Sequence, residues 1–554
     1  MSLSGSPYTL RAAGRALLLA AIAATVARGD LPCAQCHPKE TAGFAATAMG
    51  RSAGPPARVR AGSFVQAASQ TRFSVDYSGS RMVQHIARGG LSAQHDIAFQ
   101  VGSGTHAFGY LIDLGNHLFQ SPLGYFAGRG WAMSPGYETS KAPDFYRPVT
   151  PECLFCHSGR ALPVAGSLNT YRDPPFEAEA ITCERCHGPA EAHLRAPLPG
   201  TIVNPAKLPP RARDSVCEQC HLNGEERVPN PGKQLADFHP GENLEDVFSV
   251  YVYASSVDPE HPDPLRVVGQ VQRLALSRCA RESGGKLWCG TCHDPHVQPA
   301  DSKAYFRARC LGCHGDALLK THSKPDLDCA GCHMPRRPVT DGAHTIFTDH
   351  RIAIYSPREL ASPPERPAPA GTAGQPPPAL VAWREPAGEL AKRNLGLAEV
   401  LVGDRTESFP LVSRGFDALR ECADTFPNDP AVLTAIGKAL LAGGRPSEAA
   451  VAFELAAQLE PAVAVRYLNL GLAYHAVPDF TKAVENLDKA RQLDPLLEQP
   501  YLELAVIYSA EHDQAALRSV EESYLKAFPG DLKAQMALRT GGAMVTTGRG
   551  RGDR

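Results

Sequence analysis

The pattern Cys-x-x-Cys-His occurs seven times in this chain and constrains the fold more than any other feature. Two thiols three positions apart can each form a thioether with one vinyl group of a haem, and the adjacent His can bind its iron. The spacing therefore predicts seven covalently attached c-type haems. The predicted attachment residues are Cys33, Cys36, Cys153, Cys156, Cys183, Cys186, Cys217, Cys220, Cys289, Cys292, Cys310, Cys313, Cys329 and Cys332, and the predicted proximal ligands are His37, His157, His187, His221, His293, His314 and His333.

Zinc binding and disulfide bonding account for less of the pattern. A zinc knuckle or a redox dithiol also uses Cys-x-x-Cys, but zinc needs the pairs to combine into fours. A disulfide framework uses cysteines in pairs as well. Neither arrangement requires a His directly after every second Cys, so seven copies favour haem.

The N-terminus is typical of an export signal. Arg11 and Arg15 precede the apolar run 16–27 (ALLLAAIAATVA), and the small residues at 25–27 predict cleavage before Arg28. Residues 1–27 are thus a predicted signal peptide, with an uncleaved N-terminal anchor as the alternative. Export agrees with the motifs, because thioether attachment of haem follows export, and it predicts a periplasmic or otherwise exported protein. No later run is apolar enough for a membrane helix, and a formal net charge of −2 gives no reason to expect nucleic-acid binding.

Residues 28–355 form a predicted heptahaem domain. From Cys153 onward the motifs begin 30, 34, 72, 21 and 19 residues apart, and most of these intervals are too short to build a separate apolar core. We therefore expect the haems themselves to form the core, with short helices and loops around them. Residues 61–150 lack a motif, and the runs 71–77 and 96–101 are typical of short strands. The aromatic residues of this segment could pack on porphyrin faces or form the core of a small β-rich subdomain, and the sequence leaves both open.

The C-terminal part has a period of 34 residues. Gly437 and Gly471 are 34 apart, as are Ala449 and Ala483, and Pro427, Pro461, Pro495 and Pro529 continue the register. Small residues at fixed positions let paired helices pack closely, and the pattern resembles the tetratricopeptide repeat. Repeats are predicted at about 396–429, 430–463, 464–497 and 498–531, after a Pro-rich linker at 356–391. The repeat domain spans 392–540, Cys422 falls at a small buried position, and 541–554 is predicted to be a disordered tail.

The remaining histidines of the haem region are candidates for the distal iron position. Eleven are available, against two in the repeats, which favours bis-His ligation and low-spin iron suited to electron transfer. Met334 directly follows a proximal His and cannot reach the far side of the same iron, and Cys279 receives no role. The seven predicted distal ligands are His85, His106, His193, His296, His322, His344 and His350.

Three stretches carry a resemblance to a known group: Cys183-Glu-Arg-Cys-His-Gly-Pro with His193, Cys289-Gly-Thr-Cys-His-Asp-Pro-His296, and Cys329-Ala-Gly-Cys-His-Met-Pro. Over about residues 30–350 the chain resembles exported multihaem cytochromes of the cytochrome c-552/c-554 type, which are related to pentahaem nitrite reductases and octahaem hydroxylamine oxidoreductases. The resemblance implies a mostly helical, haem-packed fold in which one haem can lack a distal ligand. Nitrite reductases usually carry Lys in place of the catalytic haem's proximal His, whereas all seven motifs here end in His.

The sequence thus predicts a mainly α protein: a haem-packed domain with little regular structure and a small β-containing N-terminal segment, followed by an α-solenoid. The expected function is to transfer or store electrons, with redox proteins as partners and a protein or peptide docked on the repeats. The alternative is an oxidoreductase acting on a small nitrogen or sulfur compound at one five-coordinate haem, for which no catalytic residue is assigned. A third interpretation makes the haems a redox sensor for assembly through the repeats.

Overall fold

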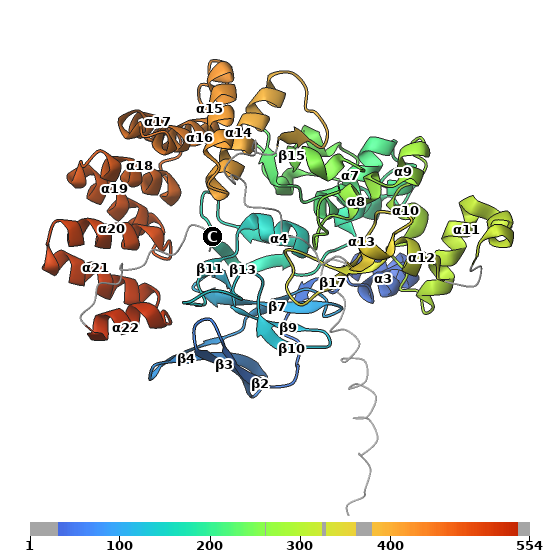
Figure 1. Cartoon of the computed structure of the whole chain (residues 1–554), viewed down its shortest axis with the longest axis horizontal. Helices are drawn as coiled ribbons and strands as arrows, with labels where there is room; N and C mark the ends of the chain where they lie inside the picture. Colours follow the sequence, from blue (N-terminus) through green and yellow to red (C-terminus); the bar gives the residue numbers. More distant parts are fainter. Residues whose placement is uncertain (1–30, 261, 324–327, 362–378, 541–554) are drawn as a thin grey trace, which may run out of the picture.

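The computed structural model describes residues 31–540 except 261, 324–327 and 362–378 (Figure 1). The predicted signal peptide, the predicted tail and the middle of the predicted linker lie outside the described residues. The described chain has a β-rich unit, a region of short helices that carry the motifs, and a row of paired helices along one side of the molecule.

The β-rich unit begins with a four-stranded antiparallel sheet. Its strands β2 (Gly62–Gln66), β3 (Thr71–Ser78), β4 (Arg81–Arg88) and β5 (Leu91–Asp96) pair in chain order. Gly89 and Gly90, with φ of 57° and 78°, make the tight turn from β4 to β5. Positive φ at both central residues of a two-residue turn matches the twist of the flanking strands, and glycine adopts it without strain.

A seven-stranded antiparallel sheet follows. It contains β1 (Ala53–Gly54), β6 (Phe99–Val101), β7 (Ala107–Leu114), β8 (His117–Gln120) and β11 (Arg147–Pro148), with β9 (Leu123–Phe126) pairing both β7 and β10 (Gly130–Met133). Side chains from the two sheets, among them Phe73, Ile86 and Tyr110, form one buried core. Most of the aromatic residues of 61–150 therefore pack within the β-rich unit, and the prediction of only a small β-containing segment was wrong in extent.

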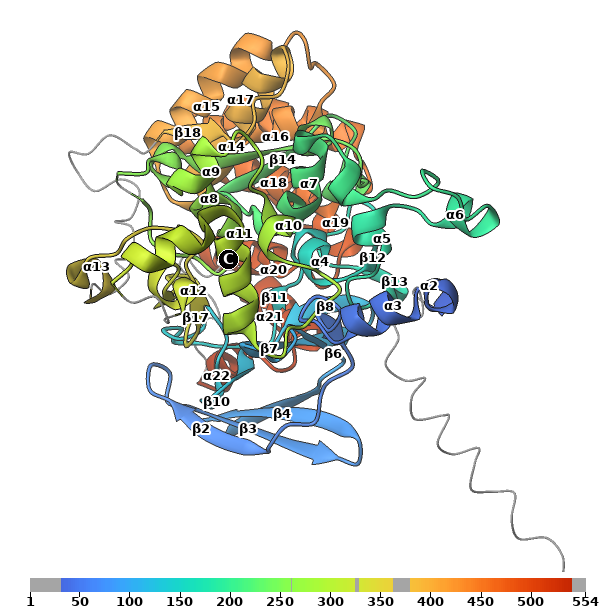
Figure 2. The ribbon, with the colours of Figure 1, turned by 90° about the vertical axis from the view of Figure 1, so that its right-hand side faces the viewer.

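Seven helices carry the motifs, and five of them have four to seven residues (Figure 2). The seven are α2 (Leu31–Cys36), α4 (Pro151–His157), α5 (Glu184–His187), α7 (Pro210–His221), α10 (Cys289–Cys292), α11 (Ser302–Thr321) and α12 (Cys329–His333). In a helix, residues three apart lie on the same face. The helical form therefore directs the two cysteines of a motif to the same side.

The end of the predicted linker is more ordered than the sequence suggested. Strand β18 (Leu380–Ala382) pairs with β15 (Phe248–Tyr253), which also pairs with β14 (Glu226–Pro229). Just after β18, the indole of Trp383 and the guanidinium of Arg384 both donate to Glu218 on α7, at 3.2 and 2.7 Å. The segment that leads to the repeats is thus attached to a motif helix.

Helices α14 to α22 form the predicted α-solenoid. Antiparallel pairs are α14 (Glu389–Arg405) with α15 (Phe409–Cys422), α16 (Pro430–Ala442) with α17 (Pro446–Leu459), α18 (Ala464–Ala476) with α19 (Phe480–Leu493), and α20 (Gln499–Ala510) with α21 (Gln514–Ala527); α22 (Leu532–Thr540) comes last. The pairs recur with the 34-residue period of the sequence. This part of the chain is therefore an α-solenoid of the tetratricopeptide type.

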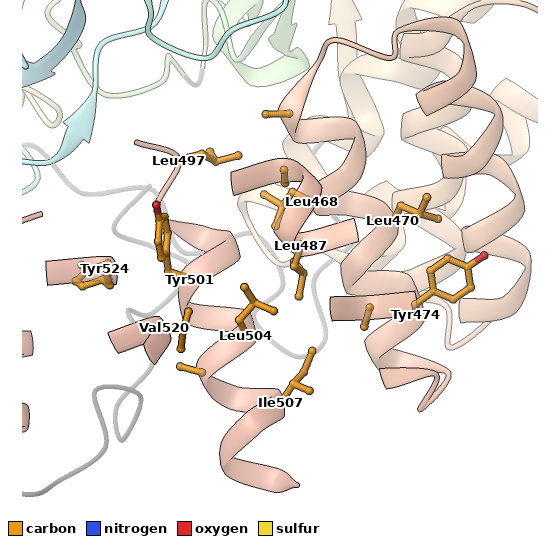
Figure 3. Close-up of a cluster of buried hydrophobic side chains, with 14 of the residues drawn as sticks. Leu468, Leu470, Tyr474, Leu487, Leu497, Tyr501, Leu504, Ile507, Val520 and Tyr524 are labelled. Carbon is orange, nitrogen blue, oxygen red and sulfur yellow. The ribbon is translucent and has the colours of Figure 1, made fainter. Parts of the chain in front are cut away.

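Small residues allow the paired helices to approach closely. A Cβ added to Gly437 on α16 would lie 2.5 Å from the ring of Phe453 on α17, and Ala449, Ala483 and Cys422 are fully buried. Figure 3 shows how Leu468, Leu487 and Leu504 meet between successive pairs. Cys422 lies in the apolar core of the first pair.

The solenoid packs against the rest of its own chain from its first helix to its last (Figure 1). At one end, Asn394 on α14 donates to Asn230 (2.9 Å) and Ser249 (3.0 Å). At the other, the Tyr146 hydroxyl accepts from the Gly530 backbone N–H at 2.6 Å while its ring meets that of Phe528 edge-on. The repeats thus frame the β-rich unit and the motif region in a single folded structure.

A titratable contact in this interface predicts a pH-dependent stability. Burial alone lowers the pKa of His117 on β8, but hydrogen bonds to Asp494 Oδ1 (3.2 Å) and to Gly115 O raise that pKa above 6.5 overall. Because the folded-state pKa is raised, this contribution is complete below about pH 6.5 and disappears as the pH rises through the folded-state value. The difference in thermal midpoint between the wild type and His117→Gln should therefore shrink from about pH 5.5 to about pH 9.

The exposed His512 provides the matched control, as His512→Asn. Its difference from the wild type should show no such trend. A His117→Gln difference that stays constant with pH would contradict the charged contact between His117 and Asp494.

Candidate site: a cavity lined by the seven motifs

One large cavity gathers the motifs. Its volume is about 3070 Å³, several times the roughly 300–1,000 Å³ of a pocket for one small molecule. All seven predicted proximal histidines line it, and so do 13 of the 14 motif cysteines. Cys153 is exposed outside this lining, with its sulfur 3.7 Å from the Thr150 hydroxyl. The motifs are therefore brought to one shared space although they run from Cys33 to His333 in the sequence.

Four of the motif histidines face a second imidazole. The ring centroids are 6.4 Å apart for His37 and His193 and 6.0 Å apart for His187 and His296, with near-parallel planes. They are 6.2 Å apart for His293 and His350, and 6.3 Å for His333 and His322, the last pair nearly perpendicular. All four second histidines are among the predicted distal ligands.

These separations fit a single metal atom between the rings. Each imidazole Nε2 lies about 1 Å from its ring centre and binds a metal at about 2 Å, so two axial ligands of one iron have centroids roughly 6 Å apart. Direct stacking or hydrogen bonding between the rings would bring them closer together. The residues present therefore fit a cofactor whose metal takes one ligand from each side.

The ring nitrogens are oriented for the same role. Nδ1 contacts an acceptor in six cases: His187 with Val203 O (2.8 Å), His193 with Thr201 Oγ1 (2.9 Å), His333 with Ala353 O (2.9 Å), His350 with Thr348 O (3.1 Å), His296 with Asp294 Oδ1 (3.1 Å) and His221 with Gln270 Oε1 (3.4 Å). A proton held on Nδ1 leaves the Nε2 lone pair available for a metal.

Burial keeps several of these imidazoles neutral. It lowers the pKa of His157, His187, His221 and His350, and it lowers the pKa of His293 to about 4. Nearby imidazoles lower the pKa of His293 further, because two positive charges close together repel each other. A neutral imidazole is the form that binds a metal.

The other predicted distal ligands are placed differently. His106 lines the cavity and stacks on Phe347 at 4.2 Å between ring centroids. His344 is next to the lining residues Ala343 and Thr345 and meets Phe126 edge-on. His85 is on β4, with Nε2 3.0 Å from the Asp76 carboxylate and beside a separate, smaller pocket, so the structure does not bring it to the motifs.

Motif cysteines from different motifs also meet. The sulfur of Cys156 lies near that of Cys220, the sulfur of Cys217 near that of Cys289, and the sulfur of Cys310 near that of Cys329. The second motif thus adjoins the fourth, the fourth adjoins the fifth, and the sixth adjoins the seventh. Cys279 lines the same cavity, and burial raises the pKa of its thiol.

Zinc binding and disulfide bonding find less support in the geometry. No disulfide bond joins any of the 16 cysteines in the structure. Nowhere in the described ranges do three or more His, Cys, Asp or Glu side chains converge on a point that would hold a bare metal ion. A zinc knuckle needs such a convergence, whereas haem iron receives four nitrogens from its porphyrin and needs only one or two protein ligands.

A buried ion pair next to the cavity has no signature in the sequence. Arg273 on α8 (Gln270–Ala275) donates to both carboxylate oxygens of Asp349, at 2.8 and 2.5 Å, and both side chains are buried. Asp349 directly precedes His350, so the pair fixes the backbone from which that imidazole projects. No spacing rule links residues 76 positions apart, and only the fold could show this pair.

Comparisons with known proteins add little. No family model matches the chain, and no curated protein matches it. One similar solved structure is the APC/C hetero-tetramer Cut9-Hcn1, with 19% identity over 27% of this chain and 29% of that chain and a TM-score of 0.24. Another is TTC0263, a thermophilic TPR protein of Thermus thermophilus, with 18% identity over 28% of this chain and 80% of that chain and a TM-score of 0.23. The chain spans less than a third of the first of these. Among the described residues, no helix is both long and apolar enough to cross a bilayer.

The Arg273–Asp349 pair yields a prediction about stability. Asp349→Asn leaves a buried guanidinium without its countercharge, and breaking such a pair costs about 3–5 kcal/mol. Thermal or denaturant unfolding of the full-length protein measures the loss.

Glu282→Gln is the control, because it breaks an ion pair with Arg278 in which both side chains are largely exposed. This change should leave unfolding unaltered. Equal effects of the two substitutions would show that Asp349 has no special structural role.

Proposed function

We propose that this chain is an exported heptahaem c-type cytochrome that transfers or stores electrons. The observation that carries the proposal is the set of four imidazole pairs, 6.0–6.4 Å apart, around one cavity lined by all seven motifs. A bis-His site has no free iron position for substrate, and it suits repeated one-electron exchange. Electron transfer is therefore favoured over catalysis at these four positions.

The residues divide into attachment and ligand roles. The cysteine pair of each motif would hold one haem through thioethers, and the motif His would bind its iron from one side. When bound, each haem supplies a one-electron redox centre, while the protein fixes its neighbours, its ligands and its exposure to water. His193, His296, His350 and His322 would bind from the other side for the first, third, fifth and seventh motifs.

Two short segments support the proposal of a route for electrons through the molecule. His187 and His193 lie six residues apart, and their rings pair with His296 and His37. His293 and His296 lie three residues apart, and their rings pair with His350 and His187. The first, third and fifth motifs are thereby neighbours in space, and the thiol contacts add the second and fourth. Short steps matter because electron tunnelling weakens steeply with distance.

The repeats pack against other parts of their own chain, apart from any partner protein that they bind. The first helix, α14, packs on the β14–β15–β18 sheet, and the last, α22, packs on the β-rich unit. Part of the solenoid surface is therefore already covered. The region of motifs depends on its cofactors for a core and gains a rigid frame from this packing. Redox proteins remain the proposed external partners, and a protein docked on the free solenoid surface is a further proposal.

The ligand pairs predict distinct spectroscopic effects of substitution. His193→Ala, His296→Ala and His350→Ala should each convert one low-spin haem to a high-spin haem, because each removes one axial ligand. Low-temperature EPR of the oxidised full-length protein counts the two spin states. His85→Ala is the control and should change neither count, since His85 lies outside the cavity.

The same spectra separate the two functional classes. A high-spin signal in the wild type that shifts with nitrite, hydroxylamine or sulfite would favour the oxidoreductase. Unchanged low-spin counts in all three cavity variants would contradict the ligand assignment.

A substitution at Tyr146 tests whether packing on the β-rich unit holds the repeats in place. Tyr146→Ala removes the packing on Phe528 and the acceptor for the Gly530 N–H, and loss of a buried aromatic side chain costs about 3 kcal/mol or more. Hydrogen exchange should accelerate in α21 and α22, with haem content unchanged at normal growth temperature. Phe409→Ala, at an exposed position of α15, should leave exchange as it is. Unaltered exchange in Tyr146→Ala would show that this contact does not hold the solenoid.

A further inference from the structure

Six imidazoles of the cavity make a hydrogen bond through Nδ1, and the acceptor is charged in only one of these six bonds. His187, His193, His221, His333 and His350 meet backbone carbonyls, a hydroxyl or a carboxamide, all of them neutral. His296 alone among these six meets a carboxylate, with Asp294 Oδ1 3.1 Å from its Nδ1. Among these six imidazoles, His296 is thus distinguished by a charged acceptor.

The turn that carries this carboxylate holds it in place. Asp294 Oδ1 also accepts from the backbone N–H of His296 at 3.0 Å, so the same oxygen fixes the chain and meets the ring. The next residue, Pro295, has a fixed φ that limits the freedom of the turn. The carboxylate and the imidazole are about half exposed, at 44% and 38%, in the absence of a bound group.

A charged acceptor changes what the imidazole does to a metal. It draws the Nδ1 proton more strongly than a neutral oxygen does, which makes Nε2 a stronger electron donor. A stronger donor stabilises ferric relative to ferrous iron and so lowers the reduction potential. The axial ligand type, another influence on potential, would be the same for the pairs of the first, third and fifth motifs, since each offers two imidazoles.

We propose that Asp294 is a positioning residue that lowers the reduction potential of the iron held by His187 and His296 below the value that a neutral acceptor would give. The proposal rests on the proposed haem function and extends it to one site. The third motif lies between the first and the fifth. Its haem would therefore accept an electron less readily than it would beside a neutral acceptor.

The substitution Asp294→Asn tests the proposal with little change of shape. Asparagine keeps an acceptor oxygen for both hydrogen bonds and removes the charge. In an EPR-monitored redox titration of the full-length protein, the low-spin component of the third motif is the one lost in His296→Ala. Its ratio of oxidised to reduced haem at a fixed potential should fall about tenfold in Asp294→Asn, since a charged hydrogen bond is roughly twice as strong as a neutral one. The other components should keep their potentials.

Glu282→Gln is the matched control. Glu282 lines the same cavity and carries the same charge, but its carboxylate pairs with Arg278 at 2.7 Å. An equal shift of the reduction potential in this variant would show that any charge near the cavity has the same effect, and it would overturn the specific role of Asp294. So would an unchanged third-motif component in Asp294→Asn. Those results would leave the proposed function intact, whereas a protein without bound haem would overturn the function itself.

Discussion

The arrangement of this molecule depends on opposed imidazoles that cross one cavity. In each of four pairs, one ring comes from a motif and the other from outside that motif, as with His293 and His350. The centroid separations of 6.0–6.4 Å match those of two imidazoles that bind one iron from opposite sides. The fold thus brings these imidazoles into a geometry that the proposed haems would use.

Because the motif region is arranged around these imidazole pairs, the regular sheets and paired helices lie in the rest of the molecule. The motif region has a modest apolar cluster around Phe155 and Phe248, and the proposed haems would fill more of its interior. The β-rich unit has a conventional core around Phe73 and Tyr110, and the solenoid has another around Leu487 and Leu504. These two rigid parts pack on each other through Tyr146, Phe528 and His117, and the motif region is attached to both.

The sequence predicted the local features well because each has a short-range signature. The motif spacing, the 34-residue period and the buried position of Cys422 could all be read from residues close together in the chain. The β-rich unit was underestimated because few of its strands show clear alternation in the sequence, although β3, β4 and β7 each have eight residues. The Gly89-Gly90 turn and the Gly115-Asn116 turn, both with positive φ at each residue, were the available signals for hairpins. Pairings such as Arg273 with Asp349 depend on the tertiary fold and have no sequence signature. The same is true of the distal ligands: His193 and His85 were both predicted, and only His193 lies opposite a motif histidine.

The most direct measurement is the intact mass of the purified, denatured protein. Thioether-bound haem stays on the polypeptide after unfolding, unlike zinc or a non-covalently bound cofactor. The account predicts a mass that exceeds the exported polypeptide by seven haems. A mass equal to the bare polypeptide, or a zinc content that accounts for the cysteines, would contradict it.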